Sequence, residues 1–308
     1  MNTMFDSKIV FPTLPTEIEE EHLFQVKQNI VKRWLVLKKL KQSFVNYSKN
    51  KSDSEIKEEF CKLHSLRQSL WYKNPTSSPH ISNKDYMVAQ DLLAKGYYRR
   101  ADNIAFAYNR TDSSYNASTI LINGLHFIAL QEPDKNTLNA FFKFLLNHRV
   151  SILVRLKPKE EFINHSSIKY WEDRLVDDKI LVSDYEVLKP AIPVAIPYYF
   201  TDKWVDDKAI SIEELYNLVQ LVRKVYKGLQ GPVACHCASG IGRTGTFMAA
   251  FILIEMIDKM QASTISIEEI VLKLSLQRPN MVANAEQYIV LYRFVDYHFS
   301  CLSKNNKS

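Results

Sequence analysis

The feature that most constrains this 308-residue chain is the run GPVACHCASGIGRTGTF at residues 231–247. A short apolar segment ends there at His236, Cys237 follows, and Arg243 opens a second apolar stretch. The chain has only seven glycines, and three of them fall within six consecutive residues of this run. Glycine allows backbone angles and close ligand approach that other residues resist. The run therefore predicts a strand, a tightly curled loop and a helix.

Such a loop is suited to bind an anion. Backbone N–H groups can converge on a dianion because Gly240 and Gly242 allow the curl, and the N-terminal end of the following helix adds positive potential. Arg243 can hold two phosphate oxygens with its planar guanidinium group. The same field lowers the pKa of Cys237 and makes its thiolate a nucleophile at neutral pH. The expected phosphate-binding residues are Ala238, Ser239, Gly240, Ile241, Gly242 and Arg243.

The four cysteines form a poor disulfide framework and a poor metal site. Cys61 and Cys301 are isolated, and Cys235 with Cys237 has no second Cys or His pair at the spacing of a zinc site. Strand alternation makes Cys235 a small core residue. We expect no metal, no cofactor and a reducing compartment, the cytoplasm.

Composition and charge narrow the function classes. The net charge of +6 suits anionic substrates without requiring a nucleic-acid partner. Hydrophobic residues make up 46% and charged residues 24%, which is typical of a soluble globular protein and excludes disorder or a fibrous fold. The most apolar stretch, residues 247–257, is shorter than the roughly 20 residues that span a bilayer. The first residues do not have the pattern of a secretory signal peptide.

Apolar periodicity predicts strands mixed with helices, which indicates an α/β or α+β sheet protein with a helical cover. The predicted strands are residues 118–122, 126–130, 150–156, 194–199 and 232–236. The predicted helices are residues 17–46, 53–71, 136–147, 211–228, 244–260, 266–276 and 284–299. A Pro- and Ser-rich stretch at residues 75–84 is the best linker candidate. We expect an N-terminal helical extension, residues 1–90, and a catalytic domain, residues 91–308.

The first predicted helix carries several lysines and an arginine beside its apolar residues. Its basic positions could contact a membrane surface or an acidic partner. The alternative is a solvated helix face packed on the catalytic domain.

The segment HCASGIGRTG resembles the active-site signature of cysteine-dependent protein tyrosine phosphatases, in which HC is followed by five residues, Arg, Ser or Thr, and Gly. Weaker matches follow the order of that family along residues 97–299. They are SYNAS (114–118), FIALQEP with NT (127–137), VSILVRL (150–156), Tyr170 with Trp171, and QRPNMVANAEQY (277–288). The resemblance implies a central, highly twisted mixed β-sheet flanked by helices.

The resemblance also implies an acid loop. Trp204, Val205 and Asp206 stand where the family has WPD, with Asp206 31 residues before Cys237. Asp206 is then the general acid that protonates the leaving tyrosyl oxygen. Asp207 and Asp202 are competitors for this role, and Trp204 anchors the assignment to Asp206.

Further roles come from the resemblance. Thr244 would donate its hydroxyl to the sulfur, and His236 would orient the loop and help hold the thiolate. Gln287 corresponds to the water-positioning glutamine. Glu161 lies nine residues before Tyr170, at the family's spacing for the glutamate that braces the signature arginine, here Arg243.

The chain also departs from the family pattern. Val205 replaces the proline of the acid loop, Ala283 and Asn284 replace the Gln and Thr that precede the second glutamine, and Asn280 replaces a glycine. Ala101 stands where the family has the tyrosine that makes the pocket deep, although Tyr97 or Tyr98 could supply that ring.

The resemblance implies a phosphomonoester hydrolase that dephosphorylates phosphotyrosine in proteins through a phosphocysteine intermediate. A phosphoinositide phosphatase is an alternative, although Ala238, Ser239 and Ile241 carry no charge for extra phosphates. An inactive phosphotyrosine-binding scaffold is another. By analogy, the composition would also suit a bacterial effector secreted into a host cell.

Overall fold

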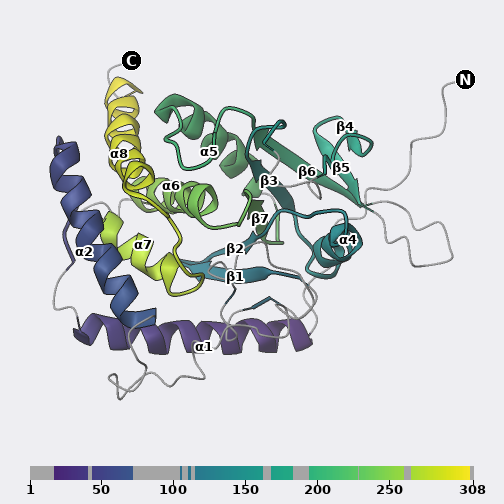
Figure 1. The fold of residues 1–308 in the computed structure, drawn as a ribbon, viewed down its shortest axis with the longest axis horizontal. Helices are drawn as coiled ribbons and strands as arrows, with labels where there is room; N and C mark the ends of the chain where they lie inside the picture. Colours follow the sequence, from purple (N-terminus) through teal and green to yellow (C-terminus); the bar gives the residue numbers. More distant parts are fainter. Residues whose placement is uncertain are drawn as a thin grey trace, which may run out of the picture.

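A twisted mixed sheet runs through the middle of the molecule (Figure 1). The computed structural model describes residues 17–40, 44–71, 105, 110–111, 115–161, 168–182, 194–227, 229–259 and 265–305. The predicted linker at residues 75–84 and the pocket-depth candidates Ala101, Tyr97 and Tyr98 lie outside these residues.

Within the described residues the sheet has seven strands, in the order β1-β2-β7-β3-β6-β5-β4. They are β1 (Ala117–Ile122), β2 (Leu125–Leu130), β3 (Ile152–Leu156), β4 (Leu175–Val176), β5 (Lys179–Val182), β6 (Val194–Thr201) and β7 (Val233–His236). The four central strands β2, β7, β3 and β6 are parallel, and antiparallel pairs close both edges. The carboxyl ends of the central strands therefore meet at one edge of the sheet.

Both faces of β3 and β7 are buried, and successive residues contribute to different cores. In β7, Val233 and Cys235 belong to one hydrophobic cluster and Ala234 to the other. Buried parallel strands need apolar residues at consecutive positions, which is why these segments read as continuous apolar runs. The expectation that Cys235 is a core residue fits this arrangement, since its side chain is fully buried.

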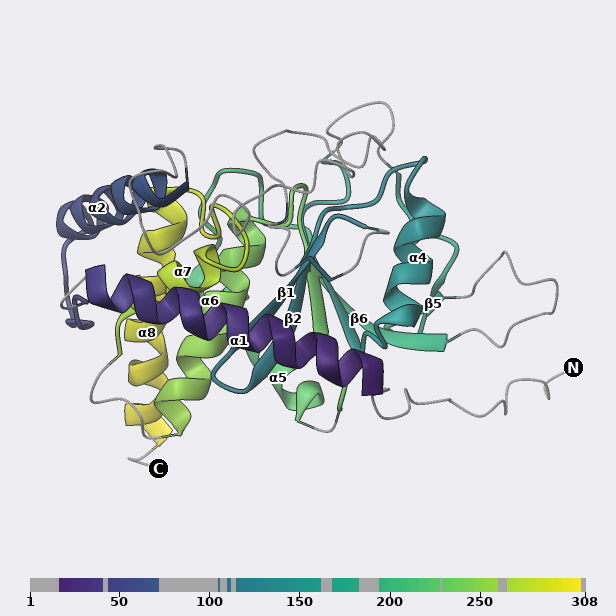
Figure 2. The ribbon, with the colours of Figure 1, turned by 90° about the horizontal axis from the view of Figure 1, so that it is seen from below.

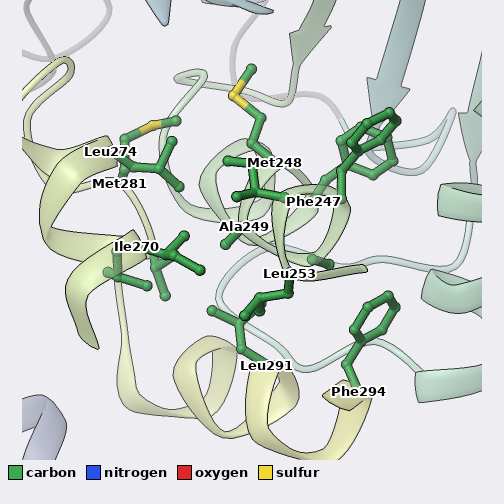
Figure 3. Packing of buried hydrophobic residues seen from close by; sticks show 14 of the residues in the cluster. Phe247, Met248, Ala249, Leu253, Ile270, Leu274, Met281, Leu291 and Phe294 are labelled. Atoms are coloured by element: carbon green, nitrogen blue, oxygen red, sulfur yellow. The ribbon is translucent and has the colours of Figure 1, made fainter. Parts of the chain in front are cut away.

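Helices cover the two faces unequally (Figure 2). One face is covered by α4 (Leu138–Asn147), and its core includes Phe141 and Phe144. The other face packs against α5 (Ile212–Tyr226), α6 (Gly242–Asp258), α7 (Ile267–Ser275) and α8 (Ala285–Asn305). Figure 3 shows α6 at the centre of this second core, with side chains such as Met248 and Leu253 packed among residues of α7 and α8. No described helix is long and apolar enough to cross a membrane.

The two N-terminal helices, α1 (Glu17–Leu40) and α2 (Asp53–Trp71), share the core of the sheet. Helix α2 contacts α7 and α8 and buries Ile56, Phe60 and Leu63 in the same cluster as α6. Leu37 of α1 belongs to that cluster too. The helical extension is thus built into the catalytic fold, and the boundary at residue 90 stays a prediction.

The elements predicted from the sequence are present, and most of their ends lie within two residues of the expected positions. Helix α1 ends at Leu40, short of the expected 46, and the described residues 44–48 are not helical. Helix α8 continues to Asn305, beyond the expected 299. Strands β4 and β5 were not predicted because segments of two and four residues are too short for a periodic pattern.

Candidate active site

The site lies at the carboxyl edge of the parallel strands. β7 pairs with β2 on one side and β3 on the other, and its carboxyl end leads directly into the loop of residues 237–241. Helix α6 begins at Gly242, so the helix N-terminus points toward the loop that precedes it. This strand–loop–helix arrangement gathers main-chain N–H groups and a positive helix end at one place.

Four of the five main-chain carbonyls of the loop form hydrogen bonds with groups outside the curl. The pairs are Cys237 O with His236 Nδ1 (3.3 Å), Ala238 O with Glu132 N (3.2 Å), Ser239 O with Arg278 Nη2 (2.9 Å) and Ile241 O with Gly245 N (2.7 Å). With these carbonyls turned outward, the N–H sides of the peptide groups face the inside of the loop, which is the geometry of an anion-binding nest. The loop is thus shaped for an anion by its backbone.

Gly240 makes this curl possible, and Gly245 lets the chain at Val282 pack closely on α6. Gly240 has φ +70°, and a Cβ atom there would lie 2.2 Å from Leu130 O. A Cβ atom on Gly245 would lie 2.5 Å from Val282 N. Both distances are far below van der Waals contact, so a side chain at either position would move the backbone. The concentration of glycines seen in the sequence therefore has a steric cause.

Cys237 is 3% exposed and lies at the base of the loop. Burial alone raises the pKa of its thiol, but the charge of Arg243, the Thr244 hydroxyl and the N–H groups of Ile241 and Thr244 bring the pKa below the ordinary value. Thr244 Oγ1 donates to the sulfur at 3.3 Å. The sulfur is therefore held in a setting that favours the thiolate.

Arg243 is the most heavily bonded side chain of the site. Its Nη1 and Nη2 atoms donate to the two carboxylate oxygens of Glu161 at 2.7 and 2.6 Å, and Nη1 also donates to Trp204 O at 2.8 Å. Nη2 lies 2.9 Å from Asp206 Oδ1. Burial alone lowers the pKa of Arg243. The negative charges of Glu161, the Cys237 thiolate and Asp206 outweigh this effect, so the pKa lies above its ordinary value. Among the described residues its buried Nε has no hydrogen-bond partner, and this leaves a donor for an anion.

The acid loop brings Asp206, and neither of its two competitors, onto Arg243. Trp204 is fully buried and donates from Nε1 to Lys208 O at 3.0 Å, which fixes the start of the loop. The Asp206 side chain is 52% exposed. Asp202 is bound instead to Arg155 Nη2 at 2.8 Å. Asp207 has φ +54°, and its carbonyl accepts from Asn284 Nδ2 at 3.4 Å.

His236 is fully buried beneath the loop. Its Nε2 is hydrogen-bonded to the Tyr170 hydroxyl at 2.6 Å, and its Nδ1 is 3.3 Å from Cys237 O. Burial raises the pKa of Tyr170 well above its ordinary value, so this hydroxyl stays protonated. The imidazole is thus fixed on both sides and holds the peptide group of the cysteine.

Gln287, near the start of α8, lies directly against the loop. Its amide is so close to Gly242 that a Cβ atom there would approach the amide nitrogen and oxygen to 2.9 Å. The side-chain Oε1 of Gln287 accepts a hydrogen bond from the main-chain N–H of Ala283 at 2.9 Å. The main-chain N–H of Gln287 donates to Asn284 Oδ1, also at 2.9 Å. The two residues that replace the family's Gln and Thr therefore help to orient Gln287.

Three further groups support the site without having been predicted to do so. Glu132 and Lys157 form an ion pair at 2.8 Å with both side chains 2% exposed. Arg278 is fully buried and ties Ser239 O to the Ser118 hydroxyl. The family matches QRPNMVANAEQY and FIALQEP contain Arg278 and Glu132 without indicating their roles, and nothing in the local sequence distinguishes Lys157 from a surface residue. Within the described residues, no group of three or more His, Cys, Asp or Glu side chains could hold a metal ion.

Comparison with known families gives one consistent result. The sequence model described as "Protein-tyrosine phosphatase" matches residues 102–188 and 177–297. Tyrosine-protein phosphatase 69D of Drosophila melanogaster is 30% identical over 194 residues, covering 54% of this chain and 13% of its own length. Tyrosine-protein phosphatase 2 of Dictyostelium discoideum is 28% identical over 206 residues, covering 59% of this chain and 54% of its own length. The chain thus spans about half the length of the Dictyostelium relative and a much smaller part of the Drosophila one.

Solved structures agree on the fold. The catalytic domain of human protein tyrosine phosphatase non-receptor type 18 superposes with a TM-score of 0.65 at 18% identity, covering 80% of this chain and 96% of that one. Trypanosoma cruzi protein tyrosine phosphatase TcPTP1 superposes with a TM-score of 0.64 at 22% identity, covering 80% and 91%.

Proposed function

Because this chain belongs to the protein-tyrosine phosphatase family, we propose that it hydrolyses phosphotyrosine in protein substrates through a phosphocysteine intermediate. The observation that carries the proposal is the Cys237 thiol, with its pKa lowered by the surrounding charge and hydrogen bonds, at the base of an anion-binding loop. A nucleophile and a phosphate site in one place are the two requirements of phosphoryl transfer to an enzyme.

In the first step, the Cys237 thiolate attacks phosphorus and the P–O bond to the tyrosyl oxygen breaks. Asp206 gives its proton to the departing oxygen, which would otherwise leave as a strongly basic phenolate. The loop N–H groups and Arg243 stabilise the equatorial phosphoryl oxygens, with the unpaired Nε as an available donor. Glu161 keeps the guanidinium plane fixed through its two hydrogen bonds.

In the second step, water attacks phosphorus, the S–P bond breaks, and phosphate leaves. The Asp206 carboxylate accepts the proton of the water, and Gln287 positions that water against the phosphocysteine. Thr244 donates a hydrogen bond to the sulfur and so stabilises it as the leaving group. His236 keeps the loop backbone in place through the Cys237 carbonyl.

The test is phosphate release from a phosphotyrosine peptide, a phosphoserine peptide and phosphoinositides side by side. We expect turnover of the phosphotyrosine peptide, its loss in Cys237→Ser, and retained binding of phosphate by that variant. Faster turnover of phosphoinositides would favour the lipid alternative. Binding of the phosphotyrosine peptide without hydrolysis would favour a scaffold.

Cellular setting is part of the same proposal. The four cysteines are free thiols, and Cys237 must stay reduced to act, which supports a role in signalling in the cytoplasm. Delivery into a host cell as a bacterial effector, and contact of the basic helix α1 with a membrane surface, are further hypotheses. Fractionation of the producing cells and of cells exposed to them distinguishes these settings.

A further inference from the structure

Helix α2 carries a buried arginine that bonds to helix α7 and to the loop between α7 and α8. Arg67 is fully buried, and its Nη1 donates to Ser275 Oγ at 3.2 Å, Met281 O at 2.9 Å and Val282 O at 3.2 Å. Within the described residues no carboxylate pairs with Arg67, and its Nε has no hydrogen-bond partner. Burial lowers the pKa of Arg67 to about 10. Burying a cation without a counter-charge is costly, so the carbonyl bonds are the compensation for this position.

The carbonyls that Arg67 binds belong to a strained loop. Val282 has φ +61°, a conformation that β-branched residues rarely adopt and that persists only where surrounding contacts enforce it. In this conformation Val282 N lies against Gly245 in the first turns of α6. Met281 is buried beside it in the core around α6 (Figure 3). Arg67 therefore holds a loop that presses on the helix carrying Arg243 and Thr244.

The same loop fixes Gln287. The residue after Val282 is Ala283, whose N–H donates to Gln287 Oε1 at 2.9 Å. On the other side of Gln287, Glu59 of α2 accepts hydrogen bonds from the hydroxyls of Tyr288 and Tyr292 at 2.5 and 2.6 Å. Helix α2 thus holds the chain both before and after Gln287.

We propose that Arg67 is a positioning residue of the phosphatase reaction, and that α2 uses it to place the Gln287 amide for hydrolysis of the phosphocysteine. The inference rests on the proposed function, because it assigns Gln287 to the second step. It extends the active site to a helix of the N-terminal extension. Loss of the Arg67 bonds slows the second step more than the first, because the loop bonds Gln287 directly, whereas Glu161 and Thr244 hold Arg243 and the Cys237 sulfur.

The experiment compares Arg67→Met, Arg67→Lys and, as a control on the same helix, Leu63→Ala. Leu63 is fully buried but forms no hydrogen bond to the loop, so its truncation loosens packing alone. Rapid mixing with p-nitrophenyl phosphate gives the rate constants of nitrophenol release and of phosphoenzyme hydrolysis. In Arg67→Met we expect the ratio of the second to the first to fall roughly ten- to a hundred-fold, because small misplacements of a catalytic group have effects of this size. Arg67→Lys should show a smaller fall in this ratio than Arg67→Met, and Leu63→Ala should keep the wild-type ratio.

An equal ratio in Arg67→Met and wild type, or an equal fall in Leu63→Ala, would overturn the proposal. Hydrogen–deuterium exchange of residues 281–287 gives a readout that does not need turnover. We expect faster exchange in Arg67→Met than in Leu63→Ala, and equal exchange contradicts the proposal. If Arg67→Met does not fold, Arg67→Lys decides by the same two measurements. If the wild type hydrolyses no phosphoester, the proposed function fails, and exchange still decides whether Arg67 positions the loop.

Discussion

The charge on Cys237 depends on Arg243 and a few hydrogen-bond donors, of which the Thr244 hydroxyl can be removed on its own. Thr244 supplies one through its hydroxyl, 3.3 Å from the sulfur. Because these donors lower the pKa of Cys237, the thiolate and its reactivity persist at pH values where an ordinary thiol is protonated. Iodoacetate should therefore alkylate Cys237 at mildly acidic pH faster than the exposed Cys61.

Thr244→Val removes the hydroxyl and keeps the shape of the side chain. Its effect on the pKa of Cys237 is upward, since a group that favours the charged form is lost. We expect the midpoint of the alkylation rate against pH to move to higher pH, while the profile of Cys61 stays the same. An unchanged midpoint for Cys237 would contradict a role of Thr244 in stabilising the thiolate.

Asp206→Asn tests the general acid. For phosphotyrosine we expect kcat to fall by about 10²- to 10⁴-fold, and for aryl phosphates with acidic phenols much less, because these leave without a proton. Asp207→Asn is the matched control, as asparagine tolerates the positive φ of that position. If the control shows the loss and Asp206→Asn does not, the acid is Asp207.

The residues of the loop could be predicted because the chemistry of Cys237 and Arg243 is written within seven consecutive positions. Glu161 lies far from Arg243 in the sequence, and only the family resemblance pointed to it. The pairing of Glu132 with Lys157 could not be predicted. Each is a charged residue in a segment that resembles a solvated loop, and the two are separated by 25 residues. Long-range pairs of charges leave no local pattern.

Among the elements, β7 is held at its carboxyl end by a charge pair from its neighbours. Glu132 follows β2 and Lys157 follows β3, so their ion pair bridges the two strands that flank β7. Glu132 also donates its N–H to Ala238 O in the catalytic loop. The ion pair therefore holds the ends of β2 and β3 together, and Glu132 also holds the catalytic loop at Ala238.

Glu132→Gln should lower the free energy of unfolding by about 3 to 5 kcal/mol, because it leaves the buried Lys157 charge without a partner. Adding Lys157→Met to that variant should restore much of the loss. Urea unfolding of the single and double variants, followed by circular dichroism, measures both effects. A double variant as unstable as the single one would show that the pair is not energetically coupled.

Strand and helix positions were predictable where burial imposes a regular pattern, as in β3 or α5. The end of α1 was not, because Phe44 continues the apolar spacing although it lies beyond the helix. Phe44 instead stacks on Trp34 with ring centroids 5.3 Å apart. An apolar residue near helical spacing can thus pack back on a helix from outside it.

On the scale of the whole molecule, the N-terminal helices and the sheet should unfold together. Helix α2 buries Ile56, Phe60 and Leu63 in the core of α6, and its Glu59 and Arg67 satisfy polar groups of α7 and α8 and the loop between them. A chain that begins at residue 91, the boundary expected from the sequence, would expose this surface. We expect it to be insoluble or to melt well below the full chain. Calorimetry of both chains checks this, and equal melting temperatures would support an independent catalytic domain.

The outward bonds of the loop carbonyls have a consequence for mutational tolerance. Because the anion nest is made by main-chain atoms, the side chain of the partly exposed Ser239 contributes none of the bonds that shape it. Substitutions there should survive selection for activity in a saturation library, whereas any side chain at Gly240 or Gly245 meets backbone. The catalytic segment can therefore vary at Ser239 but not at Gly240 or Gly245, so new recognition of substrates can arise there without loss of chemistry.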